Sequence, residues 1–241
     1  MRICKKREEK PLDRTPCSTV GAVERMFSGL AGRYSVFNRW ASLGLDGVWR
    51  KSLLREVSES QNVLDLGTGP GDLAWGLTSS VCSVVGMDIS FSMIEKARKR
   101  VPFPPHWLVG SAENLPFKEK AFDAVVSAFV VRNLYRTGIL EKALSESARV
   151  LKPQGKLVFL DLTKPRNPFV GFAHKSYNRF VLPRIGRFFF GNKWPGDYLA
   201  SSIEDLPEAN EMKDRLIRAG FQQVFVRPLW GGIVSLFVGR V

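Results

Sequence analysis

Short apolar runs alternate with amphipathic stretches along most of this 241-residue chain. The apolar runs are typical of buried strands. They lie at 62–66, 82–88, 106–109, 121–128 and 156–161. Apolar residues spaced three and four apart predict helices between and after these runs. The helices are expected near 72–80, 91–101, 138–151 and 208–219.

The order of these elements predicts an α/β domain whose parallel sheet is covered by helices on both faces. The turn Lys152-Pro153-Gln154-Gly155 is expected to introduce the strand at 156–161. Gly220 is expected to end the helix at 208–219. Two β runs at 221–226 and 233–238 then predict a terminal antiparallel hairpin.

Three segments flank or interrupt this pattern. Residues 1–20 are basic and poor in apolar side chains, which predicts a flexible tail before a single domain of residues 21–241. Apolar spacing from about 23 to 57 predicts an N-terminal helical cap. Residues 164–206 combine prolines, aromatic residues and basic residues, and we expect an insertion, helical in parts, that forms a lid over the strand ends.

A glycine-rich turn between two acids is the strongest sign of function. The first strand ends at Asp65 and breaks into Gly67-Thr68-Gly69-Pro70-Gly71, while the second ends at Asp88. This order is typical of a nucleotide site in which Asp88 accepts ribose hydroxyls. The spacing is G-x-G-x-G, and Asp65 and Asp72 flank the turn, where they would repel a pyrophosphate. The acids suit a ligand with a cationic end, so we infer an S-adenosylmethionine site.

Two further loops are expected at the same edge of the sheet. Gly110–Phe117 offers polar groups for an adenine edge, although an ordinary surface loop is an equal alternative. Ala128–Asn133 follows a strand and ends in two polar side chains. Arg132 is interpreted either as a clamp over the substrate or as an ion-pair partner of Asp161. Asp88 has an alternative role as a helix N-cap, which Ser90 can fill instead.

The composition narrows the function further. Lys and Arg number 36 against 23 Asp and Glu, a net charge of +13 that favours an anionic partner or serves solubility alone. Three cysteines without ligand spacing indicate a reducing compartment, and two histidines make a metal centre unexpected. The sequence shows neither a membrane-spanning run nor a secretory signal, so we expect a cytoplasmic protein.

Several motifs resemble one family along most of the chain. They are Phe27–Tyr34, Gly44–Arg50, Ala112–Phe117, Ala121–Val125, Arg132-Asn133, Arg149–Pro153, Tyr198–Ile203 and Gly231–Val234. On these residues the chain resembles the ubiquinone/menaquinone biosynthesis C-methyltransferases. These class I S-adenosylmethionine-dependent enzymes methylate the ring of a polyprenyl hydroquinone. The resemblance implies a Rossmann-like fold with a seven-stranded, mostly parallel sheet and a C-terminal antiparallel strand.

The resemblance also implies roles for particular residues. Catalytic roles fall on Arg132 and Asn133. Cofactor contacts are expected from Tyr34, Asp65, Gly67, Gly69, Pro70, Asp88, Ile89, Ser111, Ala112 and Ala128. The family usually has other residues at Pro70, Ser111, Ala128 and Val130. The expected substrate is demethylmenaquinol or a related quinol, with a phospholipid or another small molecule as the alternative and RNA as a weaker one.

A lipophilic quinol must be drawn from a bilayer. The basic and aromatic stretch Phe169–Trp194 is therefore a candidate for peripheral contact with an anionic membrane at its inner face. A lid core or a dimer interface explains the same stretch equally well. The sequence leaves a homodimer open, and no nucleic acid partner is expected.

Overall fold

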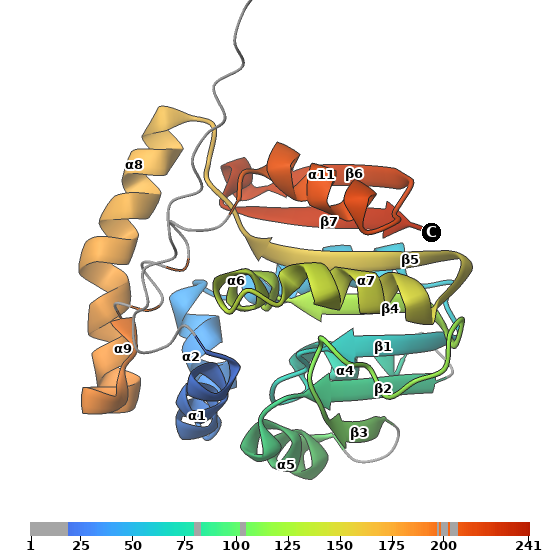
Figure 1. Ribbon diagram of the computed structural model, residues 1–241. Coiled ribbons are helices and arrows are strands. Elements are labelled where there is room, and N and C mark those ends of the chain that lie inside the picture. Colours follow the sequence, from blue (N-terminus) through green and yellow to red (C-terminus); the bar gives the residue numbers. More distant parts are fainter. Residues whose placement is uncertain (1–18, 80–82, 102–104, 197, 199–201, 203–206) are drawn as a thin grey trace, which may run out of the picture.

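Figure 1 shows the computed structural model of the chain. The structure describes residues 19–79, 83–101, 105–196, 198, 202 and 207–241. The predicted tail lies outside these residues apart from Thr19, which caps the first helix through a 3.3 Å bond from the Ala22 N–H, and Val20, which begins it. The cysteines also lie outside the described residues.

A seven-stranded sheet forms the centre of the molecule, in the order β3-β2-β1-β4-β5-β7-β6. The strands are β1 (Asn62–Leu66), β2 (Ser83–Asp88), β3 (His106–Val109), β4 (Phe122–Ala128), β5 (Leu151–Leu162), β6 (Gln223–Leu229) and β7 (Val234–Arg240). The pairs among β1 to β5 are parallel. Strand β7 runs antiparallel to both β5 and β6. The predicted fold class and the terminal hairpin are thus confirmed.

Helices pack on both faces of the sheet, as the alternating pattern predicted. They are α4 (Asp72–Leu77), α5 (Phe91–Arg100), α6 (Val131–Arg136), α7 (Leu140–Val150) and α11 (Ala209–Arg218). One core cluster joins the sheet to α7 and α11 through residues such as Leu144 and Leu216. A second cluster on the opposite face includes Leu53 and Leu77. Gly220 follows α11 with a φ of +101°, which confirms the expected helix end.

The N-terminal cap is broken into separate helices where one periodic stretch was predicted. They are α1 (Val20–Leu30), α2 (Tyr34–Ala41) and α3 (Asp46–Glu56). Leu43 and Gly44 adopt positive φ angles of 53° and 80° between α2 and α3. Such a left-handed pair turns the chain. Helix α3 packs on the sheet through Trp49 and Leu53, while α1 and α2 lie beyond the ends toward which the parallel strands point (Figure 1).

The segment after β5 forms a long helical element that we call the rod, residues 168–190. It consists of α8 (Pro168–Ser176), a π-turn (Tyr177–Val181) and α9 (Leu182–Phe190). Figure 1 shows the rod at the outer side of the molecule, beyond α1 and α2, on the side toward which the parallel strands point. No helix among the described residues is long and apolar enough to cross a membrane.

Two local predictions were wrong. Residues 152–155 do not form a separate turn before a short strand, because β5 already begins at Leu151 and bulges at Gln154, where φ is 66°. Residues 131–133 do not lie in a loop either. Phe129 turns the chain with a φ of 64°, and α6 then begins at Val131, so Arg132 and Asn133 stand in its first turn.

Candidate active site

A cavity of about 990 Å³, counting the part open to solvent, lies at the C-terminal ends of β1, β2 and β4. Every predicted cofactor residue lines it. They are Tyr34, Asp65, Gly67, Gly69, Pro70, Asp88, Ile89, Ser111, Ala112 and Ala128. Asn133 also lines the cavity, whereas Arg132 is not among its lining residues. The topology has therefore gathered residues from five separate segments around one space.

The glycine turn is shaped by steric requirements. Gly67 has a φ of +70°, and a Cβ there would come within 2.5 Å of the Val130 side chain. The N–H groups of Gly67 and Thr68 both donate to the carbonyl oxygen of Met87, at 2.8 and 3.0 Å. This folds the turn tightly between the ends of β1 and β2 and leaves the cavity open beside it.

Asp88 is held as a half-buried hydrogen-bond acceptor at the end of β2. Its Oδ2 accepts from the Gly69 N–H and its Oδ1 from the Ser90 N–H, both at 2.9 Å. Burial raises the pKa of Asp88. Ser90 caps α5 by accepting from the Met93 N–H, so the capping role falls on Ser90 and the Asp88 carboxylate can also face a ligand.

The two acids that flank the turn have different surroundings. Asp65 is 1% exposed, and its Oδ2 accepts from the Thr68 hydroxyl at 2.6 Å. Burial raises the pKa of Asp65 to about 6. Asp72 instead forms an ion pair with Arg100 and accepts from the Ser35 hydroxyl. Only Asp65 is thus a candidate partner for a cationic group in the cavity, while Asp72 fastens α2 and α5 to the turn.

Arg50 is a cavity residue to which the sequence motifs assigned no role. Its guanidinium lies 5.7 Å from the centre of the Phe129 ring, and its buried Nε has no hydrogen-bond partner among the residues that the structure describes. Arg50 also lowers the pKa of Asp65 by its charge. The cavity therefore has a cation close to an acid, a pattern that suits the carboxylate and ammonium groups of an amino acid. The Trp49-Arg50 pair was visible in a family motif, but nothing in the sequence placed it at the cavity.

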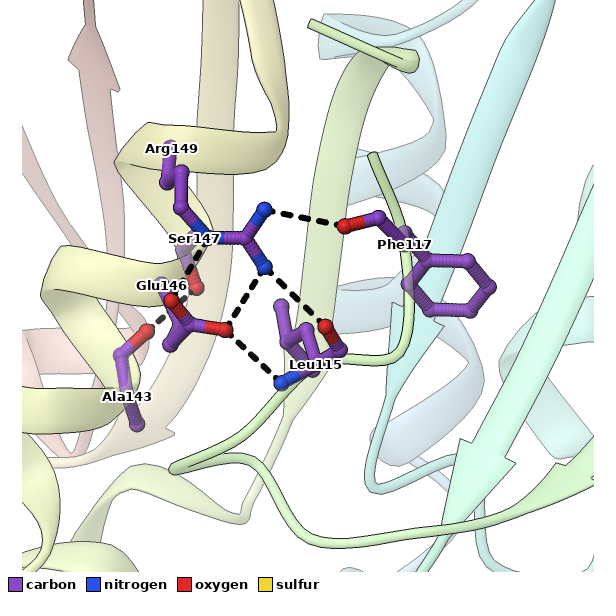
Figure 2. Close-up of polar contacts among 6 residues, drawn as sticks. All are labelled: Leu115, Phe117, Ala143, Glu146, Ser147 and Arg149. Atoms are coloured by element: carbon purple, nitrogen blue, oxygen red, sulfur yellow. Dashed lines mark hydrogen bonds and ion pairs between the residues drawn. The ribbon is translucent and has the colours of Figure 1, made fainter. Parts of the chain in front are cut away.

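The loop Gly110–Phe117 is fixed from α7, as Figure 2 shows. The Leu115 N–H donates to Glu146 Oε2 at 2.8 Å. Arg149 donates to the carbonyl oxygens of Leu115 and Phe117 at 3.0 and 2.9 Å, and its Nε lies 2.6 Å from Glu146. The Ser111 hydroxyl is buried at the cavity, and no described residue forms a hydrogen bond with it. The loop thus holds the Ser111 hydroxyl in place, where it can form a hydrogen bond with the edge of a bound ring.

Arg132 and Asn133, in the first turn of α6, have different surroundings. Arg132 is 4% exposed, and its guanidinium donates to Asp161 at 3.1 Å. This is the ion pair that the sequence offered as one alternative. Asn133 faces the cavity and its Oδ1 accepts from the Tyr198 hydroxyl at 2.9 Å. Burial raises the pKa of Tyr34, which also lines the cavity, and the charge of Arg132 lowers it.

The chain as a whole is similar to known proteins. The sequence matches the ubiE/COQ5 methyltransferase family over residues 15–240. The chain belongs to the ubiE/COQ5 methyltransferase family. A Rickettsia massiliae (strain Mtu5) protein named ubiquinone/menaquinone biosynthesis C-methyltransferase UbiE is 34% identical over 228 residues, covering 90% of this chain and 91% of that protein. A protein of the same name from Syntrophotalea carbinolica is 36% identical over 221 residues, covering 89% and 92%.

A solved structure agrees on the fold. The S-adenosylmethionine-dependent methyltransferase of Aquifex aeolicus superposes with a TM-score of 0.57 at 20% identity, over 80% of this chain and 89% of that one. Family membership confirms the predicted enzyme class, an S-adenosylmethionine-dependent methyltransferase. The cavity fits this cofactor, since Asp88, the Ser111 hydroxyl and the Asp65–Arg50 pair offer partners for its ribose, adenine and amino-acid ends.

Proposed function

We propose that the chain methylates a ring carbon of a polyprenyl hydroquinone in quinone biosynthesis, with demethylmenaquinol or a related quinol as substrate. The main support for the proposal is the cavity. It is lined both by the predicted cofactor residues of β1 and β2 and by Tyr34 and Asn133. Names of relatives more than 30% identical over most of the chain support the same reaction.

The binding roles follow from charge and hydrogen-bonding capacity. Asp88 would accept the ribose hydroxyls, and Ser111 would bond the adenine edge. Asp65 would hold the ammonium group and Arg50 the carboxylate. The bound cofactor supplies an electrophilic methyl group, so the protein must position the ring and raise its electron density.

Deprotonation of a ring hydroxyl places negative charge on the ring, and the site has groups to stabilise that charge. Asn133 and Tyr34, which both line the cavity, would contact the ring oxygens. Arg132 would act through them as a positioning residue, because its charge lies behind the wall in the pair with Asp161. Asp161 also raises the pKa of Arg132, so the guanidinium stays protonated and cannot serve as the base. A bound water is the simplest acceptor for the hydroxyl proton. After the methyl group moves from the sulfonium to the ring carbon, the hydrogen on that carbon leaves as a proton and the ring oxygen is reprotonated, so one proton is released overall.

The substrate sets the proposed location. A quinol with an isoprenoid tail dissolves in the bilayer, so we expect the enzyme at the cytoplasmic face of an anionic membrane. Basic residues near such a surface each contribute about 1 kcal/mol. A homodimer stays a prediction, and its contact would use a surface other than the rod.

Lipid extracts test the proposal. A strain that lacks this gene should accumulate a quinone one methyl lighter than normal, and the wild-type gene should restore the normal mass. The Asp88→Ala variant should fail to restore it, because each lost hydrogen bond to a charged acceptor costs roughly 1.5–3 kcal/mol of cofactor affinity. An unchanged quinone profile in the deletion strain would contradict the proposed substrate.

A further inference from the structure

The outward side of the rod exposes large aromatic side chains. Phe169, Phe172, Phe180 and Phe188 are exposed by 84%, 75%, 53% and 81%. Scattered single apolar residues are common on protein surfaces, whereas a row of them along one element marks a contact surface. The rod is therefore a candidate for a partner outside the chain.

The π-turn brings these side chains onto one face. The Leu182 N–H bonds to the carbonyl oxygen of Tyr177, five residues earlier. In an uninterrupted α-helix, at about 100° per residue, Phe188 would point about 100° away from Phe169. A π-turn winds fewer degrees per residue, so it rotates Phe188 back toward the face of Phe169. We call this the rod face, defined by Phe169, Phe172, Phe180 and Phe188.

The charge around the rod face has one sign. No acidic residue occurs between Leu162 and Gly196. Lys175, Arg179, Arg184 and Arg187 are all exposed along the rod. Such a combination of aromatic side chains and cations is typical of helices that lie in a membrane interface, where the rings enter the acyl boundary and the cations bind phosphates.

The opposite side of the rod is already occupied. Phe37 of α2 packs against the rings of Phe189 and Phe190, with centroids 6.2 and 5.2 Å away. The Tyr177 hydroxyl donates to the carbonyl oxygen of Ala41 at 2.8 Å. The same helix α2 carries Tyr34, which lines the active-site cavity. The rod is thus fixed to the wall of the active site, with its aromatic row facing away.

We propose that the rod face docks the enzyme on an anionic lipid surface. The proposal rests on the proposed function to the extent that a bilayer holds the lipophilic substrate. A two-fold contact between copies would set the basic rod face against itself, where like charges repel. An anionic lipid surface instead can bind both kinds of side chain. Its phosphates bind the basic side chains of the rod, and the apolar phase just below them accommodates the phenylalanine rings of the rod face.

Vesicle flotation with the full chain tests the proposal. We expect binding to vesicles of phosphatidylcholine with phosphatidylglycerol, weakened by salt, and little binding to phosphatidylcholine alone. Phe169→Ser with Phe188→Ser, and separately Arg179→Glu with Arg184→Glu, should each lower binding at least about tenfold. Matched controls lie elsewhere on the surface. They are Phe225→Ser on β6, 61% exposed, and Lys96→Glu with Arg98→Glu on α5.

The outcomes separate docking from catalysis. The rod variants should methylate a short-tailed soluble quinol at the wild-type rate and lose activity only toward a long-tailed quinol in vesicles. Equal binding to neutral and anionic vesicles, or an equal loss in the controls, would overturn the proposal. A rod variant that changes the sedimentation mass would assign the face to a dimer, and one that loses RNA binding alone would assign it to nucleic acid. Wild-type protein that floats but methylates no quinol would refute the proposed function and leave docking intact.

Discussion

Arg132 and Asp161 form a two-point contact behind the active-site wall. The guanidinium donates to Oδ1 of Asp161 at 3.1 Å, and the backbone N–H of Arg132 donates to Oδ2 at 2.9 Å. The side chains are 4% and 1% exposed. The contact therefore ties the first turn of α6 to β5 and fixes a positive charge next to Asn133, which faces the cavity.

The first prediction separates the structural and electrostatic roles of Arg132. Arg132→Ala leaves the Asp161 carboxylate buried without its partner, which should cost about 3–5 kcal/mol of stability. The double variant Arg132→Ala/Asp161→Asn should regain most of that stability. Its turnover should stay about 10²–10³ below wild type, because Asn133 and Tyr34 still lack the charge through which Arg132 positions them for the phenolate. Melting temperature, cofactor affinity and turnover are measured on the same preparations.

An exposed pair supplies the control for this series. Arg227 and Glu56 lie 2.9 Å apart at the surface, so Arg227→Ala should change stability by less than about 1 kcal/mol. Arg132→Lys should recover only part of the activity, since an ammonium lacks the planar fork. Near-normal turnover in the double variant would show that Arg132 serves the fold alone.

The second prediction concerns the space at Gly67. Gly67→Ala adds a Cβ within 2.5 Å of Val130, whereas Gly69 has a positive φ but open space around it. Gly67→Ala should therefore lower the melting temperature more than Gly69→Ala. Val130→Ala should rescue part of the loss in Gly67→Ala and none in Gly69→Ala. Equal losses in the two alanine variants would mean that backbone strain alone fixes this turn.

The sequence predicted the sheet well because its signals are local. Strand β1 is a run of buried residues, and its predicted bounds of 62–66 match the structure. Helix α6 was missed because it spans only Val131–Arg136, too short to show a helical period. The cap was predicted as one stretch because Leu43, whose φ is 53°, is a residue type that rarely marks a turn.

The sequence could predict those site residues that lie both in the glycine-rich motif or its flanking acids and at the end of a strand. Asp65 and Asp88 lie at the ends of β1 and β2, Gly67 and Gly69 follow β1, and all four line the cavity. Arg50 enters from a helix in the cap, and only the tertiary packing of α3 brings it there. Arg149 also could not be placed from the sequence. Its family motif was recognised, but its contact with the loop at Leu115 depends on how α7 packs.

The third prediction tests that loop contact. Arg149→Ala removes the donors to the carbonyl oxygens of Leu115 and Phe117, so the adenine side of the cavity should lose its fixed shape. The Kd for S-adenosylmethionine should rise about tenfold, as expected for a loss of about 1.4 kcal/mol, while turnover at saturation changes little. Calorimetry and steady-state kinetics measure the two effects.

A neighbouring pair serves as the control for Arg149. Lys142 also reaches the loop from α7, but its contact with Glu113 is 3.8 Å long and Lys142 is 74% exposed. Lys142→Ala should leave cofactor affinity unchanged. If Arg149→Ala lowered turnover and left the Kd unchanged, the contacts of Arg149 with the loop would not act on the cofactor side of the site.

The last prediction concerns the pH dependence that Asp65 imposes. Its pKa is about 6 in the folded protein, against an ordinary value of 3.8. Because the folded pKa is raised, the carboxyl group contributes most stability below pH 4, and that stability is lost as the pH rises toward 6. The loss amounts to about 3 kcal/mol. S-adenosylmethionine, with its ammonium group, should instead bind more tightly as Asp65 ionises.

Thermal melts and calorimetry between pH 4 and pH 7.5 measure the two opposing trends. Without ligand, Asp65→Asn should be more stable than wild type at pH 7, because no charge is buried, and its stability should depend less on pH. Its cofactor affinity should be weak at every pH. Asp88→Asn controls for the half-buried acid at the end of β2 and should keep the Asp65-dependent change in stability. If Asp65→Asn instead bound S-adenosylmethionine as tightly as wild type, Asp65 would not hold the ammonium group, and its raised pKa would reflect burial alone.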